Sequence, residues 1–211
     1  MMTVTDAQMA YDLIREQIIT TRMPPGQVIQ INEMMSMLGF GRTPIREALK
    51  RLEVEKLVSV SPRRGMFVTD VSVNDLLQVF EIRMDLEALC VGLAVERINH
   101  AELAEFRALV QQLETLGPAG GAIALLEVDR QLHALVARAS HNVILQAEAD
   151  RLLHLSLRIW YLCLDQMRST DLAEDAFCEI LVACETQDRP RAEKAMRRHI
   201  LQFYESIKEA L

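Results

Sequence analysis

The chain has 211 residues, of which half are hydrophobic and only 5% aromatic, and its formal net charge is −7. This composition favours packed helices over a β-rich core, and no apolar run approaches the ~20 uncharged residues that span a bilayer. The first residues also lack the basic start and apolar block of a secretory signal. These features exclude membrane-spanning and secreted classes, and we expect a cytoplasmic protein.

Positive charge is concentrated in one short segment of this acidic chain. Residues 1–70 hold nine lysines and arginines against eight acidic residues, whereas residues 71–211 hold 14 against 22. Within residues 39–66 the count is seven basic to three acidic. Such a local excess predicts a confined binding site for a polyanion.

The N-terminal part begins with the signals of two helices. Apolar residues repeat at helical spacing over 10–19, and the pattern stops before the breaker Pro24-Pro25-Gly26. A short β-like alternation at 28–31 leads into a second helix over 32–38. Gly39 follows directly and is the expected C-cap of that helix.

A third helix begins near Arg42 and has two distinct faces. Apolar residues share one face, whereas Thr43, Arg46 and Lys50 lie on the other. Pro44 falls in the first turn, where its missing N–H does no harm. The pattern predicts a helix that buries one side and exposes a basic side.

The next predicted element is a β-hairpin with a basic tip. Residues 57–60 and 66–69 have strand composition and flank the turn Ser61-Pro62-Arg63-Arg64-Gly65. Together with the helices, this hairpin makes a winged helix-turn-helix. The N-terminal end of the third helix would enter a major groove, where Arg42 and Arg46 meet phosphates or guanine edges. The arginines of the wing would reach the adjacent minor groove.

The segment GFGRTPIREALKRLEVEKLVSVSPRRGMFV, residues 39–68, resembles the signature of the GntR family of bacterial transcription regulators. The resemblance implies an operator-binding third helix and a DNA-binding wing. Two positions depart from the family pattern: Gly41 stands where a Ser or Thr N-cap is usual, and Asn32 stands where many members have an arginine. The residues expected to bind DNA, from the resemblance or from their place on the basic helix face, are Arg42, Thr43, Arg46, Lys50, Arg63, Arg64 and Gly65.

Residues 71–211 show helical apolar spacing almost throughout. The expected helices cover 74–99, 101–116, 122–139, 142–167, 170–186 and 190–211, with breaks at 117–121 and 140–142. The stretches FEIRMDLEALCVGLAVERI, DRQLHALVARASHN and ILVACETQDRPRAEKAMRRHI resemble the FCD ligand-binding domain of the FadR subgroup, a helical bundle around a cavity. The predicted fold is therefore mainly α, with a winged helix-turn-helix over 1–70 and an all-α effector-binding and dimerisation bundle over 71–211.

The middle of this bundle carries a candidate metal site. Asp129 and His133 are four residues apart, so one helix face presents both side chains. In metal-binding FCD proteins such a pair is joined by two later histidines; the resemblance identifies His199 as the second, but Phe177 stands in the place of the first. The resemblance thus implies a three-ligand site for zinc or a similar divalent ion, made by Asp129, His133 and His199. The alternative is a metal-free protein in which Phe177 faces an apolar or acyl effector.

Two arginines are candidates for effector binding. Arg83 and Glu87 are four residues apart on the first helix of the bundle. They could form an ordinary helix salt bridge. Alternatively, Arg83 points into the cavity and binds an effector carboxylate. Arg158, beside Trp160 and Tyr161, is a second candidate for the same part.

The sequence as a whole predicts a ligand-responsive transcription regulator and not an enzyme. We expect a homodimer, most often a repressor in this family, that binds a near-palindromic operator in double-stranded DNA and a small, carboxylate-bearing effector. A rival interpretation is a metal-dependent hydrolase in which Asp129, His133 and His199 activate water. It is weaker because no general base accompanies them at fixed spacing.

Overall fold

A computed structural model describes residues 4–164 and 176–210, and the chain divides into two compact units. The first unit holds the residues up to Val73 together with Leu157–Leu162, and the second holds the remainder. In the described ranges the elements are α1 (Asp6–Ile19), α2 (Ile31–Leu38), α3 (Arg42–Val54), β1 (Val58–Ser61), β2 (Gly65–Val68), α4 (Val73–Arg97), α5 (His100–Leu116), η1 (Pro118–Gly120), α6 (Ala122–Ala139), α7 (Val143–Cys163), α8 (Ala176–Thr186) and α9 (Arg189–Ala210). Parts of two predicted helices, at 165–167 and 170–175, lie outside the described residues.

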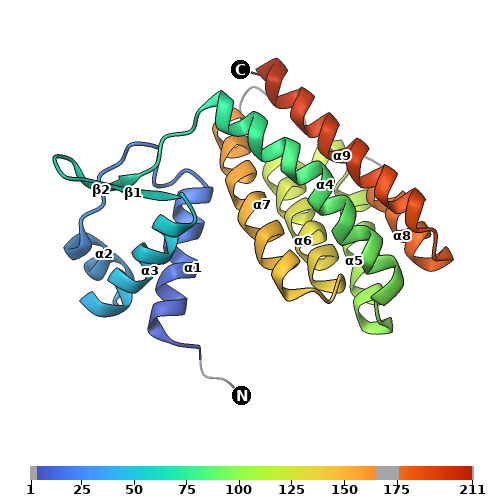
Figure 1. The fold of residues 1–211 in the computed structure, drawn as a ribbon, viewed down its shortest axis with the longest axis horizontal. Helices are drawn as coiled ribbons and strands as arrows, with labels where there is room; N and C mark the ends of the chain where they lie inside the picture. The colour runs from blue at the N-terminus through green and yellow to red at the C-terminus, as the bar shows by residue number, and fades with distance from the viewer. Residues whose placement is uncertain (1–3, 165–175, 211) are drawn as a thin grey trace. The chain divides into compact units, whose positions relative to one another are not determined.

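The first unit packs three helices beside a two-stranded hairpin (Figure 1). Thr5 caps α1 by accepting a hydrogen bond from the Gln8 backbone N–H. The apolar faces of α1 and α3 meet in a core where Ile18 and Leu49 are fully buried. Gly39 ends α2 in the left-handed conformation, with φ 73°, as predicted for a glycine C-cap. The resulting turn leaves the opposite face of α3 exposed.

The hairpin is antiparallel and differs from the sequence prediction by one residue in each strand. Val58 pairs with Val68, and Ser61 pairs with Gly65 at the end of the ladder. Gly65 has a φ of +74°, which suits glycine and lets the chain turn back into β2. The alternation predicted at 28–31 forms only a single bridge, from Val28 to Phe67.

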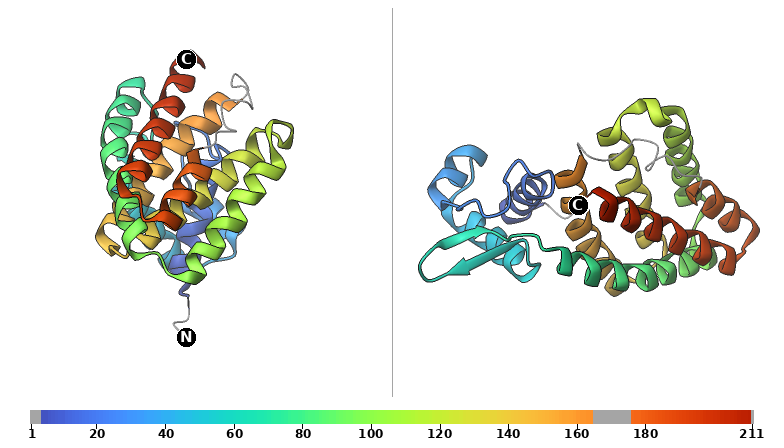
Figure 2. Two further views of the ribbon diagram at one scale, coloured as in Figure 1. Left: turned by 90° about the vertical axis from the view of Figure 1, so that its right-hand side faces the viewer. Right: turned by 90° about the horizontal axis from the view of Figure 1, so that it is seen from above.

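The second unit is a bundle of helices from α4 to α9 (Figures 1 and 2). The views place α4 and α9 side by side, and ion pairs between Asp85 and Arg197 and between Glu96 and Arg189 join them. Helix α6 is buried along most of its length, so the polar residues it carries lie in the bundle interior. No helix in the described ranges combines the length and apolar character needed to cross a membrane.

Candidate functional site

One face of α3 carries exposed polar side chains at helical spacing. Thr43, Arg46, Glu47 and Lys50 line a shallow surface pocket of ≈ 180 Å³, and all four are exposed. The spacing of three, four and seven residues from Thr43 puts them on one side of the helix. We call this set the α3 face. Three of its members were predicted to bind DNA, whereas Glu47 was not.

The start of α3 shows how the two departures from the family signature are accommodated. Gly41 is the N-cap residue of α3 and makes no side-chain cap hydrogen bond. The Arg42 Nη2 donates to Asn32 Oδ1 at 2.7 Å. Asn32, the α2 residue that departs from the family pattern, therefore forms a hydrogen bond with the first arginine of α3. Arg42 therefore lies at the exposed junction of α2 and α3, with a guanidinium that has further donors.

The wing presents its basic residues at the hairpin tip. Arg63 and Arg64 are both exposed and lie between the paired ends of β1 and β2. The Arg64 guanidinium lies 5.0 Å from the centroid of the Phe67 ring, which orients it along the hairpin. All seven residues predicted to bind DNA thus lie on exposed parts of the first unit.

The bundle interior brings together the three predicted metal ligands. Asp129 and His133 come from α6 and His199 from α9, and all three are buried. His199 Nε2 lies 3.0 Å from Asp129 Oδ1 and 3.1 Å from His133 Nε2, and His133 Nε2 lies 3.6 Å from Asp129 Oδ2. We call these residues the Asp-His-His cluster.

The spacing of these atoms fits a divalent ion. Two atoms that bind zinc tetrahedrally at ~2.0–2.1 Å lie about 3.3–3.4 Å from each other. The separations of 3.0, 3.1 and 3.6 Å bracket that value, with Asp129 Oδ1 facing His199 and Oδ2 facing His133. One ligand atom from each of the three residues lies within 4.8 Å of the others. One carboxylate and two imidazoles are also a donor set that zinc and similar metals accept.

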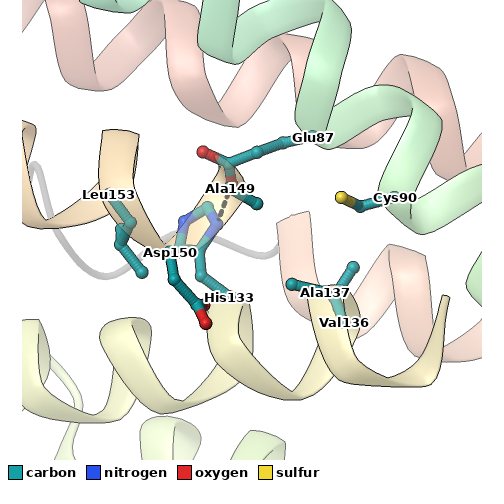
Figure 3. A pocket seen from close by; sticks show the side chains of 8 residues that line it. All are labelled: Glu87, Cys90, His133, Val136, Ala137, Ala149, Asp150 and Leu153. Carbon is teal, nitrogen blue, oxygen red and sulfur yellow. Dashed lines mark ion pairs between the residues drawn. The ribbon is translucent and has the colours of Figure 1, made fainter. Parts of the chain in front are cut away.

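Three residues outside the predicted metal site, Glu87, Arg83 and Ser156, form a chain of contacts that begins at His133. Glu87 of α4 forms an ion pair with His133 Nδ1 (Figure 3). The Nε2 of the same ring is left for Asp129 and His199. Arg83 in turn donates from Nε to Glu87 and from Nη1 to Ser156 Oγ, both at 2.5 Å. A carboxylate on the second ring nitrogen is a common way to fix the tautomer of a metal-ligating histidine.

The buried charges in this network shift one another's pKa values. Burial alone would raise the pKa of Glu87, but Arg83 and His133 beside it outweigh burial and hold the pKa well below its usual range. Burial alone would lower the pKa of His133, but the carboxylates of Glu87 and Asp129 outweigh burial and raise this pKa. The pKa of Asp129 is lowered because the two histidines outweigh its burial. The network therefore favours ionised carboxylates paired with the cationic Arg83 and with a protonated His133.

Phe177, where the sequence resemblance led us to expect a fourth ligand, packs against one side of the cluster. This residue of α8 is buried, and its ring centroid lies 5.3 Å from that of His133 and 4.9 Å from that of His199. Both pairs meet edge to face. Phe177 thus excludes water from one side of the cluster and supplies no ligand atom.

A small pocket lies beside His133 (Figure 3). Glu87, Cys90 and Asp150 line it together with His133, and it leaves ≈ 10 Å³ for the centre of a water molecule. That space corresponds to about one water. Burial, with the nearby Glu87 and Asp150 carboxylates, raises the pKa of the Cys90 thiol to about 12, so this cysteine stays a neutral part of the wall.

The two arginines predicted to bind an effector have different surroundings. Arg83 reaches the Asp-His-His cluster through Glu87, and two of its nitrogens already donate to protein groups. Arg158 groups with the first unit, where its guanidinium donates to the Thr69 carbonyl. Burial lowers the pKa of Arg158 to about 10. Of the two, only Arg83 is joined to the cluster by contacts within the described residues.

Two family profiles match this chain. Residues 6–68 match the bacterial regulatory proteins of the gntR family, and residues 78–202 match the FCD domain. The HTH-type transcriptional repressor GlaR of Escherichia coli K12 is 28% identical over 100% of this chain and 99% of its own length. The HTH-type transcriptional regulator McbR of the same organism is 30% identical over 63% of this chain and 60% of its own. The solved structure of E. coli McbR/YncC superposes with a TM-score of 0.87 and 22% identity over 98% of this chain and 99% of that one, which shows the shared fold.

Proposed function

Because this chain belongs to the gntR family of bacterial regulatory proteins and carries an FCD domain, we propose that it represses transcription by binding a DNA operator as a homodimer. In this proposal a small metabolite binds the FCD bundle and shifts the population between states of different operator affinity. The name of GlaR, which aligns over the whole chain, supports the repressor role. A protein with this role works where the chromosome lies, in the cytoplasm.

The observation that carries the DNA-binding part is the exposure of the α3 face and the wing tip. Arg46, Lys50, Arg63 and Arg64 are exposed in an otherwise acidic chain, and none of them forms an ion pair within the described residues. Their charges are therefore available to phosphates and base edges. The direct test is binding of the full chain to the DNA upstream of its own gene, measured by fluorescence anisotropy across a salt series. We expect binding at low salt and a steep loss of affinity as salt rises.

A stripe of apolar residues on α4 supports the homodimer. Val79, Ile82, Leu86, Leu89 and Leu93 follow one another at alternating spacings of three and four residues, as in a coiled-coil seam. Ile82 is 51% and Leu89 43% exposed, so part of this seam is uncovered. A second copy would cover it by a two-fold contact, and two-fold symmetry is what a near-palindromic operator requires.

We further propose that the Asp-His-His cluster holds a divalent ion and that a metabolite carboxylate binds beside it. When bound, the ion would supply a fixed positive charge that anchors the carboxylate. Asp129, His133 and His199 would be its ligands, and Glu87 would orient the His133 ring. Because the neighbouring pocket has room for only one water, a metabolite would enter only after the side chains around the cluster rearrange.

Arg83 gives the proposed effector a way to act on the bundle. Its bond to Ser156 joins α4 to α7, whereas its bond to Glu87 lies within α4. A metabolite carboxylate would compete with Glu87 for this guanidinium, since both are bidentate acceptors. Such an exchange would release Glu87 from Arg83 and change how Glu87 holds the His133 ring of α6.

A second candidate function is that of a metal-free regulator with an apolar or acyl effector. The packing of Phe177 against both histidine rings favours it, because an apolar group already fills the place of a ligand. Native mass spectrometry of the purified protein distinguishes the two by showing a bound metal or a co-purified acyl compound. The hydrolase alternative has less support, because Glu87, the nearest further carboxylate, is engaged by His133 and Arg83. Turnover of a panel of esters and amides with zinc would establish it.

A further inference from the structure

Glu47 is the only acidic member of the α3 face. It lies among Thr43, Arg46 and Lys50 along one side of the helix, and all four side chains line the same surface pocket. Arg46 and Lys50 carry donors only, and the Thr43 hydroxyl can donate or accept, whereas an ionised Glu47 can only accept hydrogen bonds. The α3 face therefore contains one side chain, Glu47, that can accept hydrogen bonds but cannot donate them.

Nothing within the described residues engages the Glu47 carboxylate. The cation one turn further along the helix, Arg51, is committed elsewhere: its Nη1 donates to Gln8 Oε1 at 2.7 Å, and its guanidinium lies 3.7 Å from the Tyr11 ring centroid. Glu55, by contrast, accepts a hydrogen bond from the Tyr11 hydroxyl. Glu47 is exposed and makes no hydrogen bond or ion pair with another described residue, so its contribution to the fold is small.

A free carboxylate at a DNA-binding surface has a specific chemical meaning. Phosphates repel it, so it lowers affinity for DNA in general. In the major groove the N4 amino group of cytosine is a donor that Glu and Asp accept from. A hydrogen bond from cytosine to Glu47 would offset the repulsion between its carboxylate and the DNA phosphates. Because this happens only where a cytosine stands at the matching position, Glu47 would discriminate between sequences.

We propose that Glu47 is a specificity-determining residue that accepts a hydrogen bond from the N4 amino group of a cytosine in each operator half-site, next to the base contacted by Arg46. The inference rests on the proposed operator binding by α3. Adjacent residues on one helix face contact neighbouring base pairs, so the Glu47 cytosine lies within one or two base pairs of the position that depends on Arg46.

The test is selection of duplexes from a randomised DNA pool by four full-length proteins: wild type, Glu47→Gln, Glu47→Ala and Glu16→Gln. Glu16 is the matched control, because it is exposed on α1 and lies outside the α3 face. Melting curves establish that all four are folded. The wild type and Glu16→Gln should select a cytosine at one fixed position per half-site, and replacing that base should weaken their binding roughly tenfold.

The two Glu47 variants make different predictions at that position. Glu47→Gln gains a donor and should change the selected base from cytosine to adenine, which an amide recognises through N6 and N7. Glu47→Ala should select no base there and bind random duplexes more tightly than the wild type, since a repulsive charge is gone. Identical base preferences in the wild type and both variants would overturn the role of Glu47 and leave operator binding intact. Failure of the wild type to enrich any sequence would overturn operator binding itself.

Discussion

The ring of Phe177 meets the ring of His133 edge to face, with centroids 5.3 Å apart and planes at 88°. Phe177 stands where the family resemblance implies a metal ligand, and His133 is a ligand of the proposed metal site. Their contact means that the substitution removes a donor without leaving a gap. The Asp-His-His cluster consequently offers three ligand residues, and an apolar ring packs against both of its histidines.

Restoring a histidine at this position should tighten metal binding. In Phe177→His the new imidazole would lie beside both existing histidines and could complete a tetrahedral set. We expect zinc to bind Phe177→His more tightly than the wild type, and His133→Ala to lose zinc binding, in isothermal titration calorimetry. No zinc uptake by the wild type, together with a lower melting temperature of Phe177→His in zinc, would show that the ring only fills space and that the added polar group is unsatisfied.

Glu87 should matter to metal affinity although it is not a ligand. Its contact with Nδ1 fixes the His133 ring, and loss of such a partner typically costs ~10–100-fold in affinity. Glu87→Gln should weaken zinc binding by about that factor in a competition assay with a chelating dye. Glu127→Gln is the control, because Glu127 also lies on the bundle and, among the described residues, pairs only with its helix neighbours Arg130 and Gln131. Equal affinities for both variants would contradict the orienting role.

Metal affinity should fall as the pH falls. A histidine must be neutral to bind a metal, so protons compete with the ion. Because Glu87 and Asp129 outweigh burial and raise the pKa of His133, this competition begins above the ~6.5 of free histidine. The dissociation constant for zinc should increase from pH 8 to pH 6, by up to roughly tenfold per pH unit once His133 is protonated. A constant that does not change over this range would indicate that His133 is not a ligand.

The α4 seam should hold the dimer together. Aspartates in place of Ile82 and Leu89 would put two charges into a contact that a second copy is proposed to cover. The double variant should have the monomer mass by light scattering at micromolar concentration, whereas the wild type and a fragment of residues 71–211 should have the dimer mass. Ile123→Asp is the control, because Ile123 is 60% exposed on α6 and lies outside the seam. A dimer mass for the double variant would place the interface elsewhere.

The first unit could be predicted closely because its signals are local. Gly39 and the glycine of the hairpin mark turns that only a few backbone conformations allow, and the apolar spacing fixes the buried face of α3. The local excess of basic residues does not single out the acidic Glu47, although its spacing of four residues from Thr43 places it on the same helix face. The one-residue difference in the hairpin reflects a turn whose last residue, Gly65, still pairs with Ser61.

The bundle site could be predicted only in part. Asp129 and His133 share a helix face and so could be paired from spacing, and resemblance added His199 from a distant helix. No local pattern connects Glu87 or Ser156 to His133, because their proximity depends on how α4 and α7 pack against α6. The limited space beside His133 likewise follows from side-chain packing, which the apolar pattern does not determine.

The most direct test of the central claim, that the α3 face reads an operator, is the ratio of specific to non-specific DNA affinity for the wild type and Arg46→Ala. Anisotropy titrations with an upstream duplex and a scrambled duplex, at two salt concentrations, give this ratio for each protein. The wild type should prefer the upstream duplex, and Arg46→Ala should lose roughly 1–3 kcal/mol of that preference, whereas Arg63→Ala should weaken binding to both duplexes alike if Arg63 contacts phosphate. A wild type that binds neither duplex at low salt, or an Arg46→Ala variant with an unchanged ratio, would contradict the account.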